Sequence, residues 1–213
     1  MQKTTINLAV VTPLIFIAMY ILPLGLRDLW SPDEIRYAEI AREMVSSRNW
    51  TVPTFNGLRY FEKPVLGYWM NALSQVLLGE NNFSVRFASV FSSAGSAFCL
   101  LLLVDRFVNR QIAWITVSIF ISLFMVAGIG TYSVLDSIFS LWLTAAFTAF
   151  FFASAADNSA ARYKDYGLAG LFCGLAFLTK GFLALALPVI VVLPFLLWQK
   201  QFMSVLRWGW WVI

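Results

Sequence analysis

The sequence predicts an all-α protein, a polytopic bundle of transmembrane helices. Hydrophobic residues make up 60% of the 213 residues and charged residues only 12%, and the mean hydropathy is +0.76. Several stretches also approach or reach the roughly 20 consecutive apolar residues that cross a bilayer. Because a soluble globular protein carries about twice this share of charged residues, most soluble classes are excluded and a membrane protein is predicted.

Six apolar stretches are predicted to span the membrane. The first follows Lys3, and its apolar core is too long for a secretory signal and lacks a small-residue cleavage site, so we expect a retained anchor. The predicted spans are 6–26, 87–104, 112–129, 132–156, 166–178 and 182–198, and a seventh begins at 208. Because residues 208–213 are too few to cross a bilayer, we expect the chain to be an N-terminal fragment, residues 1–213 forming part of one transmembrane domain.

Basic residues in the short connections predict the orientation, because short cytoplasmic loops carry an excess of Lys and Arg. Lys180 is the only such residue in a short connection on one side of the predicted membrane. The other side carries Lys3, Arg106, Arg110, Arg162, Lys164, Lys200 and Arg207. The N-terminus is therefore predicted to be cytoplasmic, and residues 27–86 to form an extracytoplasmic, juxtamembrane loop.

This loop, residues 27–86, is where the sequence places the functional site. It holds seven of the 15 Lys and Arg residues and seven of the 11 Asp and Glu residues. The chain has no histidine, so any acid, base or metal ligand must be a carboxylate, an amine or a tyrosine. Cys99 and Cys173 lie in apolar stretches, where free cysteine behaves as a small hydrophobe, and indicate no disulfide framework. The net charge of +4 does not point to a nucleic-acid partner.

A helix is predicted from Pro32 to about Ser47. Ser31 is placed at the N-cap, Pro32 at the first helical position and Glu34 at the third, which is the pattern of a capping box. The helix is expected to lie along the membrane surface. Glu34 is fully accounted for by this capping role.

Asp33 is the anomalous residue of this helix. At 100° per residue, one stripe is formed by Asp33, Tyr37, Ile40 and Met44. A carboxylate on a buried stripe is unfavourable unless it is paired, and Arg36 is the nearest partner. The alternative is that Asp33 and Glu34 only complement the positive end of the helix dipole, a contribution of about 0.3–1 kcal/mol.

A second interfacial helix is predicted from Pro64 to Leu78, after an extended loop at 49–60. Pro64 occupies its first position, and a narrow polar stripe along it is formed by Gly67, Asn71, Ser74 and Gln75. Glu62 and Lys63 thus lie at a helix N-terminus beside the membrane, a geometry that favours anions. An exposed pair of opposite charges without further function explains this stretch equally well.

Two ionisable residues at the ends of spans complete the candidate site. Asp136 lies a turn inside an apolar run, and Lys180 precedes Gly181; both are expected on the same side as Asp33 and Lys63. An ionisable residue at the head of a span is a candidate site residue. Lys180 is also explained as a C-terminal helix cation followed by a glycine cap.

Carboxylates and cations gathered at one membrane face suit a lipid phosphate with a polar head group, because Lys and Arg bind phosphate and carboxylates act on the head group. The candidate catalytic residues are Asp33, Glu62 and Asp136. The candidate substrate-binding residues are Arg36, Tyr37, Arg59, Tyr60, Lys63 and Lys180. A transporter is the alternative, but it would need ionisable residues near midplane and repeated, broken helices; a structural subunit is a third possibility.

The motifs are similar to those of one family. They are Pro32-Asp33-Glu34-x-Arg36-Tyr37, Gly57-Leu58-Arg59-Tyr60-Phe61-Glu62-Lys63-Pro64, Gly67-Tyr68-Trp69, Asn81-Asn82-Phe83-x-Val85-Arg86-Phe87, Gly130-Thr131-Tyr132-x-Val134-Leu135-Asp136 and Thr179-Lys180-Gly181-Phe182. Together they resemble the bacterial 4-amino-4-deoxy-L-arabinose lipid A transferases. The Asp-Glu pair alone indicates only the wider class of protein-mannosyltransferase-like GT-C glycosyltransferases.

The resemblance implies a GT-C fold in the bacterial inner membrane with its active site on the periplasmic face. It implies transfer of aminoarabinose from undecaprenyl phosphate to a lipid A phosphate, which gives resistance to polymyxin and cationic antimicrobial peptides. Asp33 would be the catalytic carboxylate, Lys63 and Arg36 would contact the donor phosphate, and Glu62 and Asp136 would be further site acids.

Other readings remain open beside this resemblance. A different polyprenyl-phosphate-sugar-dependent glycosyltransferase, with a protein or glycan acceptor, is the alternative. The expected partners are the donor lipid, lipid A and membrane lipids, and no nucleic acid. The sequence shows no required cofactor; a divalent metal is left open, with Glu62 as a candidate ligand.

Overall fold

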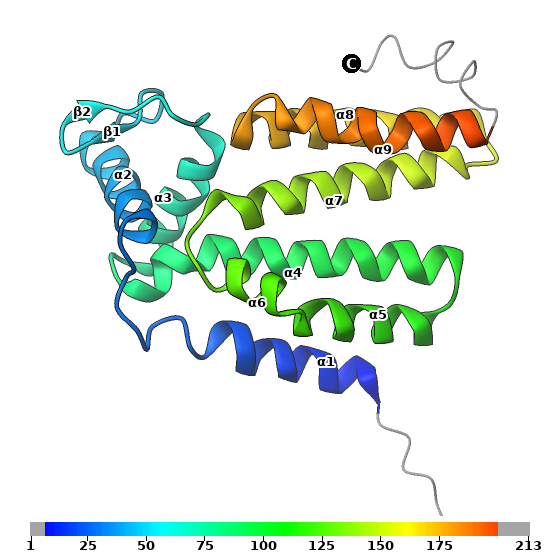
Figure 1. The fold of residues 1–213 in the computed structure, drawn as a ribbon, viewed down its shortest axis with the longest axis horizontal. Coiled ribbons are helices and arrows are strands. Elements are labelled where there is room, and N and C mark those ends of the chain that lie inside the picture. Colours follow the sequence, from blue (N-terminus) through cyan, green and yellow to red (C-terminus); the bar gives the residue numbers. More distant parts are fainter. Residues whose placement is uncertain (1–6, 200–213) are drawn as a thin grey trace, which may run out of the picture.

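The computed structural model describes residues 7–199, which are mostly helical (Figure 1). The long helices run side by side, and the short helices α2 and α3 lie with a small hairpin at one end of the bundle. The elements are α1 (Leu8–Phe16), the π-helix η1 (Ile17–Ile21), α2 (Asp33–Ser47), β1 (Thr54–Phe55), β2 (Leu58–Arg59), α3 (Leu66–Leu78), α4 (Asn82–Phe107), α5 (Arg110–Ser122), α6 (Phe124–Gly130), α7 (Leu135–Ser154), α8 (Ser159–Lys180) and α9 (Leu183–Trp198). The predicted all-α bundle is confirmed.

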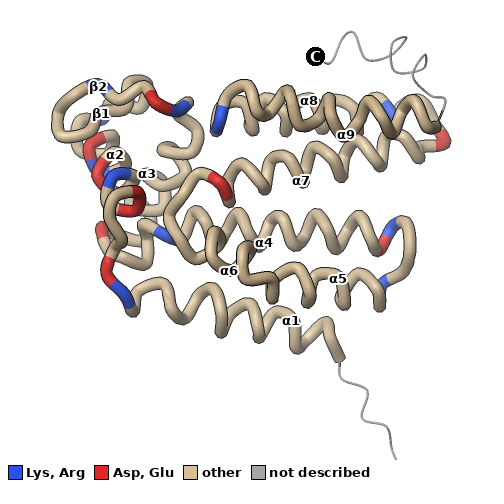
Figure 2. The backbone as a smooth tube through the Cα atoms, in the orientation of Figure 1, with Lys and Arg blue, Asp and Glu red and all other residues tan. Residues whose placement is uncertain are grey.

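The bundle has the properties of a membrane protein. By length and composition, α4 and α7 are each able to cross a bilayer, and α5 with α6 would count as a third span despite a bend of 69° between them. The segments Leu8–Ile21 and Leu183–Trp198 are shorter apolar helices. Lys, Arg, Asp and Glu gather at the two ends of the long helices and leave the middle uncharged (Figure 2). This distribution matches an apolar slab between two aqueous faces.

The observed helix boundaries differ from the predicted spans in several places. The stretch predicted as one span over 112–129 is broken at Leu123, whose backbone is extended. Just before the break, the hydroxyl groups of Ser118 and Ser122 donate to the carbonyl oxygens four residues earlier, a pattern that bends helices. The stretch predicted over 166–178 lies within the longer α8. Lys3, Lys200, Arg207 and the predicted start of a span at 208 lie outside the described residues.

Helix α2 buries a different acid from the one predicted. Its buried residues are Glu34, Tyr37, Ile40, Ala41 and Met44, whereas the side chain of Asp33 is 38% exposed. The prediction that Asp33 lies on the buried stripe is therefore wrong. The predicted capping box is also absent: Pro32 is the N-cap residue without a side-chain hydrogen bond, and Glu34 accepts from the backbone N–H of Trp30 instead.

The loop between α2 and α3, predicted to be extended, contains a two-stranded hairpin. Strands β1 and β2 pair antiparallel, with Phe55 opposite Leu58. Asn56 and Gly57 form the turn with φ values of 53° and 75°. An Asn-Gly pair with positive φ at both positions is the favoured two-residue turn, so the signal was present in the sequence.

The face of α3 that packs against the protein is its polar stripe. Gly67, Asn71, Ser74 and Gln75 are buried, and the Gln75 side chain donates to the carbonyl of Ala38 in α2 at 3.0 Å. The outward face is formed by Trp69, Leu73, Val76, Leu77 and Leu78, all exposed. An apolar outer face is what a helix lying in the membrane interface requires.

Candidate active site

A buried ion pair fixes the start of α2. The carboxylate of Glu34 is fully buried and accepts hydrogen bonds from Arg86 Nε at 2.7 Å and Arg86 Nη2 at 2.8 Å. It also accepts from Arg27 Nη1 at 2.7 Å and from the backbone N–H groups of Trp30 and Ser133 at 2.9 and 3.0 Å. Burial by itself raises the pKa of Glu34, but these hydrogen bonds outweigh it and lower the pKa to about 2. Glu34 is therefore an ionised, fully hydrogen-bonded structural group.

Arg86 extends this network to the chain before α2. Its guanidinium, also fully buried, donates to the carbonyl oxygens of Leu24, Arg27 and Asp28 at 2.5, 3.0 and 2.8 Å. Neither Arg86 nor Arg27 was singled out as a site residue in the sequence analysis. The available signal was a guanidinium at the head of an apolar helix, which requires a partner. The network holds α4, α2 and the connection before α7 together.

Arg36 is the centre of the exposed charged cluster. It forms an ion pair with Asp33, and its Nη1 lies 3.7 Å from a carboxylate oxygen of Glu62. Its guanidinium lies 5.3 Å from the ring centroid of Tyr37 and 5.9 Å from that of Tyr60. Burial lowers the pKa of Arg36, but the nearby tyrosines and carboxylates raise it overall. Arg36 therefore stays protonated, and within residues 7–199 its buried Nε has no hydrogen-bond partner.

Glu62 and Lys63 lie beside Arg36, just before α3. Glu62 accepts a hydrogen bond from Tyr60, and Lys63 Nζ lies 3.3 Å from its carboxylate. The hydrogen bond from Tyr60, followed by the contacts with Lys63 and Arg36, lowers the pKa of Glu62. Within the described part of the chain no group of three or more metal-binding side chains is present, so Glu62 stays a candidate ligand only by prediction.

Asp136 and Lys180 form a second charged group at the same end of the bundle. Lys180 Nζ donates to Asp136 Oδ1 at 2.6 Å and lies 5.7 Å from the ring centroid of Phe139. Gly181, with φ of 72°, follows the last residue of α8. Asp136 is 52% exposed and Lys180 only 19%, so the carboxylate keeps oxygen lone pairs that face solvent.

The predicted site residues thus fall into two groups and one outlier. Asp33, Arg36, Tyr37, Tyr60, Glu62 and Lys63 form one continuous cluster. Asp136 and Lys180 form the second group, and Figure 2 shows Lys, Arg, Asp and Glu gathered at the end of the bundle where α2 and α3 lie. Arg59 lies on exposed strand β2 and its side chain has no hydrogen bond or ion pair within residues 7–199. The structure gives no contact that draws Arg59 into the site.

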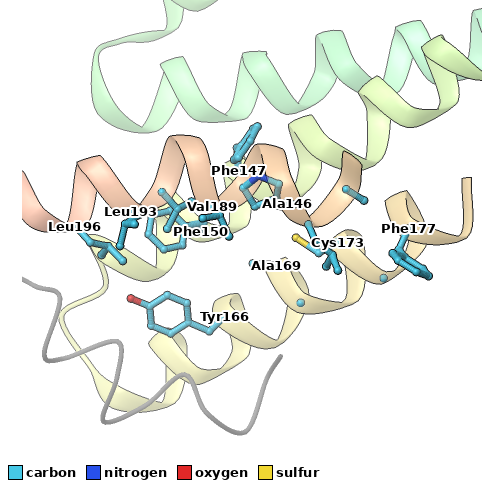
Figure 3. A pocket seen from close by; sticks show the side chains of 16 residues that line it. Ala146, Phe147, Phe150, Tyr166, Ala169, Cys173, Phe177, Val189, Leu193 and Leu196 are labelled. Carbon is cyan, nitrogen blue, oxygen red and sulfur yellow. The ribbon is translucent and has the colours of Figure 1, made fainter. Parts of the chain in front are cut away.

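A separate apolar cavity of about 660 Å³ lies between α7, α8 and α9 (Figure 3). Phe147 and Phe150 of α7, Cys173 of α8 and Val189 of α9 face it. Among residues 7–199, no charged side chain lines it. The cavity can therefore hold an apolar group.

Comparison with known proteins places these features in a family context. The chain matches the family described as dolichyl-phosphate-mannose-protein mannosyltransferase over residues 6–213. It is 70% identical to the undecaprenyl phosphate-alpha-4-amino-4-deoxy-L-arabinose arabinosyl transferase of Shewanella sediminis, over 100% of this chain and 39% of that protein. A relative of the same description from Pectobacterium carotovorum is 52% identical, over 98% of this chain and 38% of its own length.

Solved structures agree with the sequence relatives. The structure of ArnT from Cupriavidus metallidurans bound to undecaprenyl phosphate matches with a TM-score of 0.88 and 26% identity, covering 94% of this chain and 37% of that one. Its apo form matches with a TM-score of 0.82 and 25% identity, covering 92% and 38%. The resemblance seen in the motifs is confirmed. The chain spans about two fifths of the length of the curated relatives it matches.

Proposed function

Because the chain belongs to the family of the dolichyl-phosphate-mannose-protein mannosyltransferases, we propose that it acts as a polyprenyl-phosphate-dependent glycosyltransferase. The donor is undecaprenyl phosphate-linked 4-amino-4-deoxy-L-arabinose, and the acceptor is a phosphate of lipid A. The curated relatives carry this donor in their descriptions. Adding an amino sugar to an anionic lipid lowers the negative charge of the surface, which accounts for resistance to polymyxin and cationic peptides.

The observation that carries this proposal is the cluster around Arg36 at the end of an uncharged helical bundle. Arg36 and Lys63 are two cations within reach of one anion, because both lie against the same carboxylate, Glu62. A phosphate on a lipid anchor meets such a pair at the membrane surface while its chain stays in the apolar layer. When the phosphate binds, it replaces the half-exposed Glu62 as the ion-pair partner of Arg36 and Lys63.

The transfer forms one bond and breaks one bond at the anomeric carbon of the sugar. An oxygen of the acceptor phosphate attacks this carbon, and the bond to the undecaprenyl phosphate oxygen breaks, so the leaving phosphate keeps the electron pair. Because the second pKa of a phosphomonoester is about 6, the acceptor is already anionic at neutral pH and needs no strong base. Arg36 and Lys63 stabilise the leaving phosphate. Asp33 stabilises the positive charge that develops on the sugar or holds the acceptor in line.

We place the protein in the bacterial inner membrane, with the N-terminus in the cytoplasm and the charged cluster on the periplasmic face. The spans are α1 with η1, α4, α5 with α6, α7, α8 and α9. Arg106 and Arg110 lie at the α4–α5 connection, and Arg162 and Lys164 lie at the start of α8. The α2–α3 end is opposite these connections (Figure 1), so the excess of basic residues in short loops supports this orientation.

Lys63→Met tests the phosphate-binding role in the intact protein. We expect the affinity for undecaprenyl phosphate to fall about 10- to 100-fold, the range for losing one charge-assisted hydrogen bond. Arg106→Met removes an exposed cation at the opposite end of the bundle and is the matched control. Unchanged affinity in Lys63→Met, measured in detergent micelles by titration with the lipid, removes Lys63 from this role.

Asp33→Asn tests the catalytic role, because it removes the charge and keeps the shape of the side chain. We expect turnover to fall by about 10²–10³-fold, with donor affinity unchanged or raised because Arg36 loses a competing carboxylate. Turnover is followed by mass spectrometry of lipid A incubated with the donor. A near-normal rate contradicts the role. Transfer to a protein or glycan in place of lipid A would assign the chain to another acceptor within the same family.

A further inference from the structure

Two polar side chains on the buried face of α3 have no hydrogen-bond partner in the part of the chain that the structure describes. Tyr68 is 0% exposed and Asn71 is 1% exposed. Within residues 7–199, the hydroxyl group of Tyr68 and both amide atoms of Asn71 are unpaired. Leaving such groups unpaired is unfavourable, and native structures rarely do so without water or a ligand. Since the two residues are three apart on a helix, they share one face.

Tyr68 belongs to a buried apolar cluster that also contains Tyr37 and Leu135, each of which is next in the chain to a residue of one charged group. Gly67, which precedes Tyr68, packs so closely on α7 that a Cβ atom there would lie 2.4 Å from Leu135 Cδ2, and Leu135 is the residue before Asp136. On the other side, the ring of Tyr68 lies 5.9 Å from that of Tyr37. The Tyr37 ring is in contact with the Arg36 guanidinium. The buried face of α3 therefore bridges the Arg36 cluster and the Asp136–Lys180 pair.

The electrostatic surroundings of Tyr68 agree with this position. Burial is the main cause of a raised pKa for its hydroxyl group, and Tyr37, Tyr60 and Glu62 raise it further while Arg36 lowers it. The Tyr68 hydroxyl is therefore close enough to the exposed cluster to sense its charges. It stays protonated at neutral pH and is able both to donate and to accept a hydrogen bond.

The chemistry of this pair differs from that of a phosphate site. Arg36 and Lys63 offer only donors and positive charge, which suits a phosphate. Tyr68 and Asn71 are neutral, and Asn71 has an unpaired acceptor as well as an unpaired donor. A ligand group that forms hydrogen bonds with both the unpaired donor and the unpaired acceptor must itself donate and accept. A hydroxyl group does so. The indole nitrogen of the half-buried Trp142 on α7 is also buried and, among the described residues, unpaired. It adds one more donor beside the apolar cluster that contains Tyr68 and Leu135.

We propose that Tyr68 and Asn71 form the subsite that binds a hydroxyl group of the donor sugar. This assignment rests on the proposed function, since it takes the ligand to be a sugar linked to a polyprenyl phosphate. It goes beyond that function by naming the residues that distinguish the glycosylated lipid from the bare lipid. A site built to hydrogen-bond a substrate hydroxyl discriminates strongly against a ligand that lacks it.

Tyr68→Phe tests the proposal, with two ligands titrated against the intact protein in micelles. One ligand is undecaprenyl phosphate-linked aminoarabinose, and the other is undecaprenyl phosphate alone. We expect the variant to bind the glycosylated lipid about tenfold more weakly, the worth of one neutral hydrogen bond, and to bind the bare lipid like the wild type. Tyr166→Phe, in the apolar cavity away from the charged cluster, is the matched control.

Stability separates ligand binding from a structural role. Because the Tyr68 hydroxyl has no partner in the described protein, its removal should leave the unfolding temperature of the ligand-free protein unchanged or raise it. Asn71→Leu, similar in shape, should show the same selective loss of the glycosylated lipid. Equal weakening of both lipids, no weakening of either, or a lower unfolding temperature for Tyr68→Phe would overturn the proposal and assign the pair to bound water. Because acceptor is absent from this titration, a failure of lipid A modification would overturn the proposed function and not the subsite.

Discussion

Replacing Glu34 by Gln should destabilise the protein more than any other single removal of a carboxylate charge in α2. The carboxylate of Glu34 and the guanidinium of Arg86 are both fully buried and joined by two hydrogen bonds of 2.7 and 2.8 Å. The amide of glutamine keeps the size of the side chain but presents an N–H group to donors and removes the negative charge. Arg86 then stays buried without a counter-ion, although it keeps its hydrogen bonds to backbone carbonyl oxygens.

The size of the effect follows from the burial. Breaking a buried ion pair by removing one partner costs about 3–5 kcal/mol. The lowered pKa gives an independent value: a fall from 4.5 to about 2 corresponds to about 3 kcal/mol of stabilisation by the charged form. At about 2–4 °C per kcal/mol, the unfolding temperature should fall by about 10 °C.

Thermal unfolding in detergent, followed by the fluorescence of the chain's 9 tryptophans, measures this shift. Glu39→Gln is the matched control, because Glu39 pairs with Arg42 on the outer face of the same helix, where ion pairs contribute little. The double variant Glu34→Gln/Arg86→Met removes both buried charges and should recover part of the loss. Equal unfolding temperatures for Glu34→Gln and Glu39→Gln, or additive losses in the double variant, would refute the reasoning.

Three further predictions concern the same end of the bundle. Because the pKa of Glu34 is lowered from 4.5 to about 2, its stabilisation is complete above about pH 5 and is lost as the pH falls toward 2; unfolding temperatures measured over this range should fall in the wild type and less in Glu34→Gln. Gly67→Ala should lower the free energy of unfolding by about 1–3 kcal/mol, because the added methyl group overpacks against α7. Gly174→Ala, with open space around it, should not. Chemical unfolding measures the free energy of unfolding of both variants. Lys180→Met should leave the unfolding temperature nearly unchanged, since Asp136 is half-exposed. It should lower the transfer rate about tenfold in a lipid A assay. A normal rate contradicts a site role for Asp136 and Lys180.

The sequence was sufficient to predict which segments meet. Hydrophobic runs predicted where the long apolar helices lie, and the position of each charge along these runs predicted that Asp33, Lys63, Asp136 and Lys180 gather at one end of the bundle. This part of the prediction needs only the length of a span and the alternation of direction from one span to the next. The bend at Leu123 was not predictable from hydropathy, because the residues on both sides of it are equally apolar.

The sequence was not sufficient to predict which of two adjacent acids is buried. Helical periodicity places Asp33 and Glu34 at similar distances from the centre of the stripe around Tyr37, so it does not discriminate between them. The choice depends on Arg86, 52 residues further along the chain, and on two backbone N–H groups outside α2. Polar contacts between distant segments have no signature in local periodicity, and the unpaired Tyr68 and Asn71 were missed for the same reason.

The acids differ in how many hydrogen bonds their carboxylates accept and in how exposed they are. Glu34 has six hydrogen bonds to its two oxygens and no exposed surface, so it has no lone pair left for a ligand. Asp33, Glu62 and Asp136 are 38%, 46% and 52% exposed and are held by cations that a phosphate is able to engage. A buried ion pair gives little net stability over an apolar core. Its value here is that it fixes the start of α2 and the connection before α7 relative to α4, the segments that carry Asp33 and lead to Asp136.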